Sequence, residues 1–431
     1  MIYKHLTKSF ALALFSITIS ISAFSQDSLI NYYNKKVLTY LDKQKALSPY
    51  YLIDKSGIKI FASSYNKSIC KTEFAIDWHQ LQAFKTVLKN CNQTKVAEIY
   101  SSGKFSDSIN CIANHLAKKL TNNIGFLSGY KIAIDAGHVA GDFVTGQIEQ
   151  KFLKFGPNPS CNIVDSIFIA EGVLTYATAS LLKDSLEKYG AAVFLTRPFN
   201  GSTAFGITFE DWLKDNFNNT IEQYYRSGKI SMEKKKWYLT KATKREKFRL
   251  VFKDIDLRKR AEIINDYQPD FTIIIHFNVD ETNTGWTKPG NKNFNMAFVG
   301  GAFMGGDLSN IDKRFEFLRL LITNELEESI ILSSKTLNSF EKNLGIKTAS
   351  FKDATYLPKG CLSTEKNGVY CRNLQLTRYI HSPLVYGETL YQDNINECVL
   401  LNKEIDKTKN KRVQEIANAY FIGVKNYIEV K

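Results

Sequence analysis

Hydrophobic residues follow two alternating patterns in the larger, C-terminal part of the chain. Short, nearly continuous apolar runs at 131–135, 191–197 and 271–278 are typical of strands buried in a parallel sheet. Between these runs, residues 165–190 and 256–270 carry apolar residues at helical spacing. This order of strand, helix, strand and helix predicts an α/β domain with a layered, mostly parallel sheet flanked by helices.

The pattern also divides the chain. Residues 26–128 combine helical spacing with a strand-like run at 57–63, which predicts a small N-terminal α+β section of unknown role. The alternating pattern covers 129–431, and stretches at about 143–165 and 200–253 interrupt it. We expect these stretches to be insertions into the α/β domain, helical in character.

The first 25 residues resemble a signal peptide. Lys4 and Lys8 precede an apolar stretch, Phe10–Phe24, and small residues at Ala23 and Ser25 suit a cleavage site. A membrane anchor is the alternative, but the apolar run is short and its C-terminal flank is polar. We therefore predict an exported protein, periplasmic or extracellular, with no transmembrane segment in the mature chain.

Composition narrows the class of partner. The chain has 431 residues, of which 44% are hydrophobic and 13% aromatic, as expected of a globular protein with a substantial core. The formal net charge of +14 favours anionic partners. Export and the lack of any aromatic-interleaved RNA motif argue against a nucleic-acid partner.

Much of the positive charge is concentrated in one segment. Residues 229–260 contain thirteen Lys or Arg and four Asp or Glu. Such a run is most often a solvated helical face. The functional alternatives are a contact surface for an anionic polymer and a lid over the active site.

Seven cysteines are an odd number for an exported chain, so at least one is free or pairs between chains. No CxxC pair occurs, which argues against a structural zinc knuckle. Cys361 and Cys371 flank "LSTEKNGVY", whose Asn-Gly predicts a tight turn. A disulfide across that turn is one expectation; small buried thiols are the alternative.

Three residues far apart in the sequence occupy matching places in the predicted fold. His138 follows the first strand, His276 lies near the end of the third, and Glu171 lies near the start of the first long helix. The carboxyl ends of parallel strands meet at one edge of a sheet, so these side chains can converge. Two histidines and a carboxylate are a ligand set of catalytic zinc, with a fourth position left for water. The sequence therefore predicts a Zn²⁺ site.

A hydrolase of this type also needs a base near the water. The stretch "PLVYGE" predicts a further strand, and Glu388 lies at its end. The same edge of the sheet could then hold Glu388 beside the metal ligands. The alternative is a surface acid before a loop.

At this point the sequence resembles a known family, the zinc-dependent N-acetylmuramoyl-L-alanine amidases. "IDAGHVAGD" resembles its opening "DAGHGGxD" motif, "GAAVFLTR" its "GxxVxLTR", and "IIIHFNVDE" its "SIHANA". "FNMAFVGGAF" resembles the strand that follows. Further matching positions are Leu257, Arg260, Asn265, Arg378, Pro383 and Glu388. The resemblance covers roughly 130–405 and leaves both insertions unmatched.

The resemblance implies roles for individual residues. His138, Glu171 and His276 would be the zinc ligands, and Glu388 the catalytic glutamate. Asp142 matches the second acid of the opening motif and could orient His138 through a hydrogen bond; a plain turn residue is the alternative. The implied reaction is hydrolysis of the amide between N-acetylmuramic acid and L-alanine in peptidoglycan, in some relatives under the control of an activator protein.

The chain also departs from the family pattern. The family continues its last motif with "xGFxSN", whereas this chain reads "TLYQDN" and keeps only Asn394. The insertions imply a reshaped substrate cleft. Two other functions stay open: another zinc hydrolase acting on wall peptides or sugars, and a non-catalytic wall-binding protein.

Overall fold

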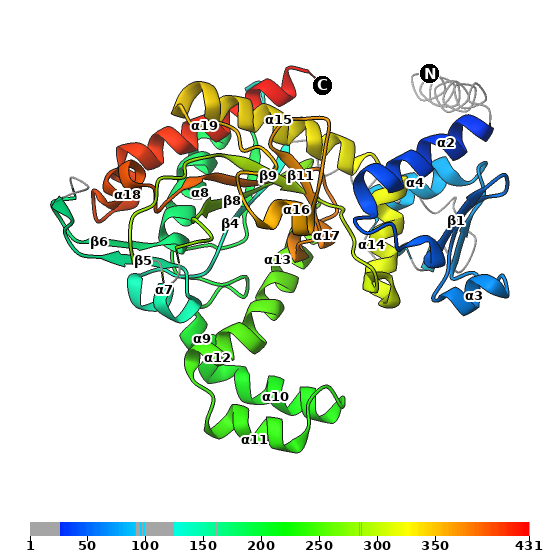
Figure 1. Cartoon of the computed structure of the whole chain (residues 1–431), viewed down its shortest axis with the longest axis horizontal. Coiled ribbons are helices and arrows are strands. Elements are labelled where there is room, and N and C mark those ends of the chain that lie inside the picture. The colour runs from blue at the N-terminus through cyan, green and yellow to red at the C-terminus, as the bar shows by residue number, and fades with distance from the viewer. Residues whose placement is uncertain are drawn as a thin grey trace, which may run out of the picture. The chain divides into compact units, whose positions relative to one another are not determined.

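The computed structural model describes residues 26–91, 95–96, 98–99, 125–159, 163–283, 285 and 287–430. The chain forms two compact units (Figure 1). The first unit contains the chain up to Lys85 together with the later segment Phe303–Ile322. The second unit contains Thr86–Ala302 and Thr323–Lys431. The predicted signal peptide, residues 1–25, lies outside the described residues.

The first unit is a small α+β structure. Its antiparallel sheet has the order β1 (Tyr51–Asp54), β2 (Gly57–Ile60), β3 (Phe74–Ile76). Its helical segments are α2 (Gln26–Lys36), η1 (Val37–Leu41), η2 (Ser48–Tyr50), α3 (Ser64–Ser68), η6 (Asp307–Ser309) and α14 (Ile311–Ile322); α4 (Leu81–Asn90) begins here. Arg314 of α14 pairs with Glu73, at 3.0 Å from Nη2 to Oε1. A segment from the middle of the chain therefore completes this unit.

The second unit is built on a seven-stranded mixed sheet with the order β10-β11-β9-β12-β8-β4-β7. Its strands are β4 (Lys131–Ala136), β7 (Ala192–Leu195), β8 (Phe271–Asn278), β9 (Met296–Val299), β10 (Cys361–Ser363), β11 (Val369–Arg372) and β12 (Leu384–Tyr391). Four of the six strand pairings are parallel, and β4, β7, β8 and β12 run in one direction. The predicted fold class is confirmed.

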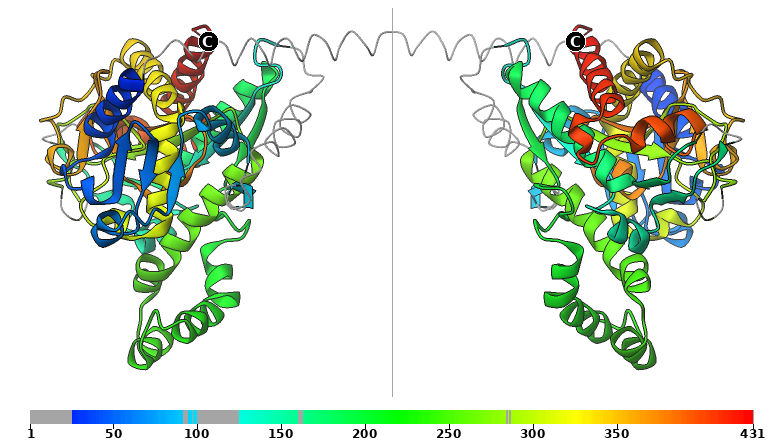
Figure 2. Two further views of the ribbon diagram at one scale, coloured as in Figure 1. Left: turned by 90° about the vertical axis from the view of Figure 1, so that its right-hand side faces the viewer. Right: turned by 90° about the vertical axis from the view of Figure 1, so that its left-hand side faces the viewer.

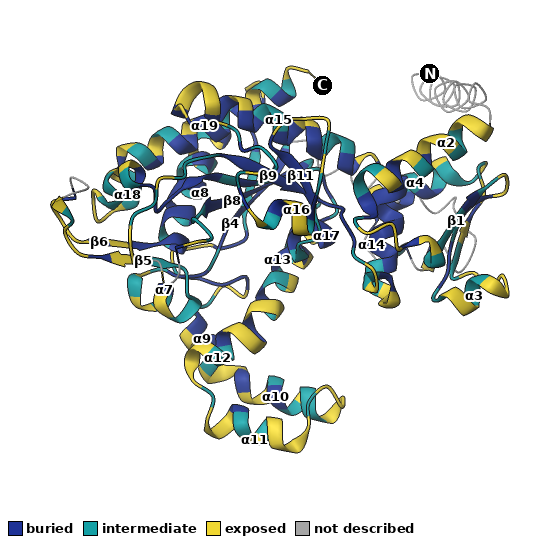
Figure 3. Ribbon diagram, in the orientation of Figure 1, coloured by how far each residue is buried: buried dark blue, intermediate teal, exposed yellow. Residues whose placement is uncertain are grey.

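Helices cover both faces of this sheet. One layer contains α8 (Glu171–Lys188), α15 (Glu325–Leu344) and α19 (Lys411–Ile428), which pack on one another and on the strands (Figure 1). On the opposite face α13 (Lys253–Tyr267) and α17 (Gln375–Tyr379) enclose a cluster that includes Ala133, Ile264 and Ile274. Three shorter segments complete the unit: α16 (Tyr356–Gly360), α18 (Ile395–Asn402) and η7 (Lys407–Lys409). Figure 3 shows the strands buried between them.

The two insertions adopt different structures. The first forms α7 (Phe143–Glu149) and one strand of the hairpin β5 (Phe152–Phe155) and β6 (Ile167–Ala170). The second is helical: α9 (Phe209–Asp215), α10 (Phe217–Arg226), α11 (Met232–Thr240), α12 (Lys244–Lys247) and the π-helix η5 (Phe248–Phe252), which leads into α13. Figure 2 shows these helices extending away from the sheet.

The predicted turn before Cys371 is present, but the disulfide is not. β10 and β11 form an antiparallel hairpin, and Cys361 and Cys371 both carry thiols. The register pairs Cys361 with Arg372 and Leu362 with Cys371. The two cysteines therefore point to opposite faces of the hairpin, because successive side chains alternate along a strand. The expectation of a bridge here was wrong.

Candidate metal centre and active site

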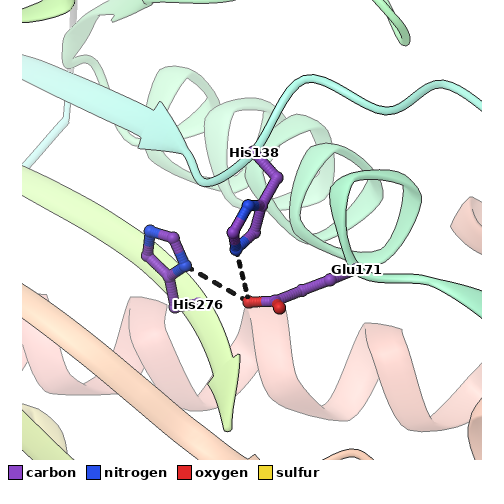
Figure 4. Close-up of side chains that lie close together, drawn as sticks. All are labelled: His138, Glu171 and His276. Carbon is purple, nitrogen blue, oxygen red and sulfur yellow. Dashed lines mark hydrogen bonds and ion pairs between the residues drawn. The ribbon is translucent and has the colours of Figure 1, made fainter. Parts of the chain in front are cut away.

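His138, Glu171 and His276 converge at one edge of the large sheet (Figure 4). β4 ends two residues before His138, α8 begins with Glu171, and His276 lies on β8, the neighbour of β4. One ligand atom from each residue lies within 4.8 Å of the other two. The predicted convergence is present, because the parallel register brings both strand ends to the same rim.

Glu171 is the centre of this group. Its Oε1 lies 3.1 Å from His138 Nε2 and 3.2 Å from His276 Nδ1, and accepts a hydrogen bond from the amide of Phe277 at 3.1 Å. The side chain is fully buried, and Oε2 has no hydrogen-bond partner. A buried, unsatisfied carboxylate oxygen beside two imidazoles fits a divalent cation, which would satisfy all three groups.

The turn between β4 and α7 holds Gly137 and His138 in constrained positions. A Cβ on Gly137 would lie 2.4 Å from the ring of His276, so only glycine permits this approach. His138 has φ 65°, in the left-handed region. For a non-glycine residue this conformation costs of order 1–2 kcal/mol, and such strain is concentrated at functional sites.

Glu149, not Asp142, contacts His138 from the first insertion. Asp142 caps α7, accepting a hydrogen bond from the amide of Thr145 at 2.7 Å. Glu149 Oε1 lies 2.8 Å from His138 Nδ1, and its Oε2 accepts from the amides of Val139 and Ala140. The expected role of Asp142 was therefore wrong, and its turn-residue alternative holds. No pattern in the sequence marked Glu149.

The pKa values of the two histidines are shifted in opposite directions. Burial disfavours the imidazolium of His138, but Glu171 and Glu149 outweigh it and raise its pKa to about 9. Burial lowers the pKa of His276 to about 4, although Glu171 opposes the shift. Without a metal ion, His138 thus carries the proton that the pair of carboxylates attracts.

Glu388 lies beside the candidate metal ligands His138, Glu171 and His276. It pairs in register with His276 across β12 and β8, and both line one cavity of about 410 Å³. Burial, followed by the charge of Glu171, raises the pKa of Glu388 to about 7. The ring of Tyr386 stacks on His276 with centroids 4.5 Å apart and an interplanar angle of 3°. A base with a pKa near neutrality is suited to proton transfer.

The first insertion contributes to the cavity wall, and the second does not. The wall residues are His138, Lys151, Glu171, His276, Phe277, Asn278, Val279, Asp280, Glu281, Asn283, Tyr386 and Glu388. Lys151 comes from the hairpin after α7, with Nζ 3.9 Å from Glu171 Oε2. None of these residues comes from 200–253, so the second insertion does not cover the site in this structure.

Comparison with known proteins identifies the family to which this architecture belongs. The family model of N-acetylmuramoyl-L-alanine amidases, Amidase_3, matches residues 132–422. No curated protein sequence matches the chain. Among solved structures, the chain is similar to the CwlD amidase from Clostridioides difficile in complex with the GerS lipoprotein, at 17% identity and TM-score 0.36, covering 70% of this chain and 100% of that one.

The amidase Ami1 from Mycobacterium smegmatis is also similar, with 12% identity, TM-score 0.39, and coverage of 72% of this chain and 100% of that one. The family model spans most of the chain and includes every residue of the candidate site. The chain therefore belongs to the N-acetylmuramoyl-L-alanine amidase family.

Proposed function

We propose that this chain hydrolyses the amide bond between N-acetylmuramic acid and L-alanine in peptidoglycan, with Zn²⁺ held by His138, Glu171 and His276. The observation that carries the proposal is the convergence of these ligand atoms within 4.8 Å in a cavity that Glu388 also lines. Zinc in such a site supplies Lewis acidity, which activates water and polarises the scissile carbonyl.

The chain's own residues supply the proton transfer. The Glu388 carboxylate accepts a proton from the attacking water and passes it to the amide nitrogen, which leaves as the amine of L-alanine. Glu388 is half-buried, and desolvation together with the charge of Glu171 raises its pKa to about 7, so it can both take and return a proton near neutral pH. Tyr386 stacks on the ring of His276 and Glu149 contacts His138 Nδ1, so each keeps one imidazole ring in place.

The test is Glu388→Gln on purified peptidoglycan, with products identified by mass spectrometry. Wild-type protein should release stem peptides and leave intact lactyl ends. The variant should bind zinc normally and turn over about 10³-fold more slowly, within the usual range for a general base. Glu281→Gln is the matched control, because Glu281 lines the same cavity but pairs with Lys292 at 3.0 Å.

Other products would support the alternatives. Cleavage within wall peptides or sugars would indicate another zinc hydrolase. Binding to sacculi without zinc and without cleavage would indicate a wall-binding protein. A possible activator protein stays a prediction: if one is required, the purified chain alone should be nearly inactive and gain turnover when the partner is added.

The same proposal places the protein outside the cytoplasm. A disulfide at Cys91 agrees with an oxidising compartment. Every helix in the described part of the chain is too short or too polar to span a bilayer. N-terminal sequencing of the mature protein should begin at Gln26; a start at Met1 would contradict the predicted signal peptide.

A further inference from the structure

Two buried guanidinium groups hold the turn that carries His138. Arg197 follows β7, Arg260 lies on α13, and their exposed fractions are 0% and 1%. Arg197 Nη1 donates to the carbonyls of Gly137, at 3.1 Å, and of His138. Arg260 Nη2 donates to the same His138 carbonyl at 2.7 Å. One backbone oxygen therefore accepts hydrogen bonds from two cations.

Arg197 also reaches the second ligand. Its Nη2 donates to the carbonyl of Gly172, directly after Glu171, at 3.2 Å. A single side chain thus ties the turn of His138 to the start of α8. A Cβ on Gly172 would lie 2.5 Å from the carbonyl of Ala140, so turn and helix are already in close contact.

Acidic groups compensate the buried charge. Arg260 Nε donates to Asp256 at 2.7 Å, and its Nη1 donates to Asp135 at 3.0 Å. Burial and the neighbouring Arg260 lower the pKa of Arg197 to about 10, so it stays protonated at neutral pH. Hydrogen bonds from charged donors are the stronger kind, and planar guanidinium groups can serve several acceptors at once.

The left-handed backbone of His138 explains what these bonds achieve. At φ 65° its carbonyl points to the two guanidinium groups while its imidazole lies against Glu171. A relaxed turn would return His138 to negative φ and move the ring. The geometry points to Arg197 and Arg260 as positioning residues that hold His138 in its metal-binding conformation. This inference rests on the proposed function, because it assigns His138 as a zinc ligand, but its test measures metal binding and does not depend on turnover.

The test uses metal binding rather than turnover. In the full chain, Arg260→Gln and Arg197→Gln should each weaken zinc affinity by about tenfold or more, as changes to supporting residues around metal ligands do. With Co²⁺ in place of zinc, the visible absorption spectrum should change in both variants, because the coordination geometry changes. Arg260→Lys should recover part of the affinity, since an ammonium can still reach one carbonyl.

Arg319→Gln is the matched control. Arg319 is fully buried and ion-paired to Glu316 at 2.7 Å, but belongs to the other compact unit. It should lose stability and keep the wild-type Co²⁺ spectrum. If the Gln variants do not fold, Arg197→Lys and Arg260→Lys decide. Wild-type spectra and affinities in folded variants of both arginines would overturn the inference, whereas an inactive wild type with an intact spectrum would count only against the proposed function.

Discussion

The two insertions lie in one domain and contribute to it in different ways. The first contains two acidic and two basic residues and so has no net charge. It brings Glu149 to His138 Nδ1 at 2.8 Å and Lys151 into the cavity. The second contains twelve Lys or Arg and six Asp or Glu, and places no side chain in the cavity wall. Charge density along the sequence is thus a poor guide to which segment serves the site.

The second insertion has its own core instead. Its buried cluster contains Val139, Phe209, Trp212, Phe217, Ile221, Tyr238, Phe248, Val251 and Phe252. Val139 is the residue after His138, and Ile148, next to Glu149, packs against the same cluster. The second insertion therefore supports the site indirectly, through apolar contacts with the residue after His138. The first insertion contacts the site directly with charged side chains. Each difference can be tested through one quantity, the affinity for zinc.

The largest effect should come from Glu149→Ala. The change leaves His138 Nδ1 and the amides of Val139 and Ala140 without their carboxylate. Removing such a partner of a metal-binding histidine usually weakens metal affinity by about 10–100-fold. Competition with a chelator measures the loss, and turnover should fall with zinc content.

Glu222→Ala is the control from the second insertion. Glu222 is paired with Lys235 and Arg226 at the surface. It should leave zinc affinity unchanged. Equal losses in both variants would mean that the two insertions do not differ in the way described.

The pH dependence of zinc binding sharpens the role of the first insertion. Glu171 and Glu149 raise the pKa of His138 to about 9, so the metal-free site holds a proton that zinc must displace. Affinity should therefore rise about tenfold per pH unit up to about pH 9 and then level off. His276, with a pKa of about 4, adds no proton in this range.

The measurement is best made in Glu388→Gln, where that carboxyl cannot titrate. In Glu149→Ala the plateau should begin at a lower pH, because one of the two carboxylates that raise the pKa of His138 is gone. If zinc affinity does not vary between pH 6.5 and 8.5, zinc does not displace a proton from His138 on binding.

Trp212→Ala probes the apolar support from the second insertion. Trp212 is 2% exposed and packs against Phe217 and Phe252. Its removal should lower the free energy of unfolding by about 3–5 kcal/mol, as for other large core truncations. Zinc affinity of the folded variant should change by less than about threefold, because Glu149 still holds the turn. Denaturant titration and chelator competition measure the two effects. A tenfold loss of affinity would place the second insertion among the direct supports of the site.

Sequence patterns predicted the sheet and the convergence of the three candidate metal ligands for a physical reason. Buried strands are continuous apolar runs, and parallel strands bring their ends to one rim, so His138 and His276 could be located from strand positions alone. Glu171 followed from the helix that starts at that rim. These predictions needed only the order of elements.

Other features depend on three-dimensional contacts that no local pattern records. Glu149 was missed because its place next to His138 depends on the path of α7, while Asp142, nearer in sequence, suits a helix cap. The expected Cys361–Cys371 bridge is absent because Cys361 lies opposite Arg372, one residue away from Cys371. The assignment of α14 to the N-terminal unit depends on long-range contacts such as that between Arg314 and Glu73.

The smallest effect on the site should come from the surface of the second insertion. Lys236 and Lys241 are exposed, and their replacement by Glu reverses charge without touching the buried cluster. Zinc affinity and cleavage of a soluble muramoyl peptide should stay at wild-type values. If this face contacts an anionic polymer, pelleting with peptidoglycan sacculi should weaken a few-fold at low salt and become equal to wild type at high salt, because salt screens exposed charges.

The control is Lys366→Glu with Lys403→Glu, an equal charge change on exposed lysines outside the insertion. Weaker pelleting in both double variants would reflect net charge alone, and no change in either would leave a plain solvated face. Faster cleavage by the insertion variant would instead indicate a lid that closes over the site in solution. That result would reverse the comparison, since the second insertion would then act on the cavity directly, as the first does through Glu149 and Lys151.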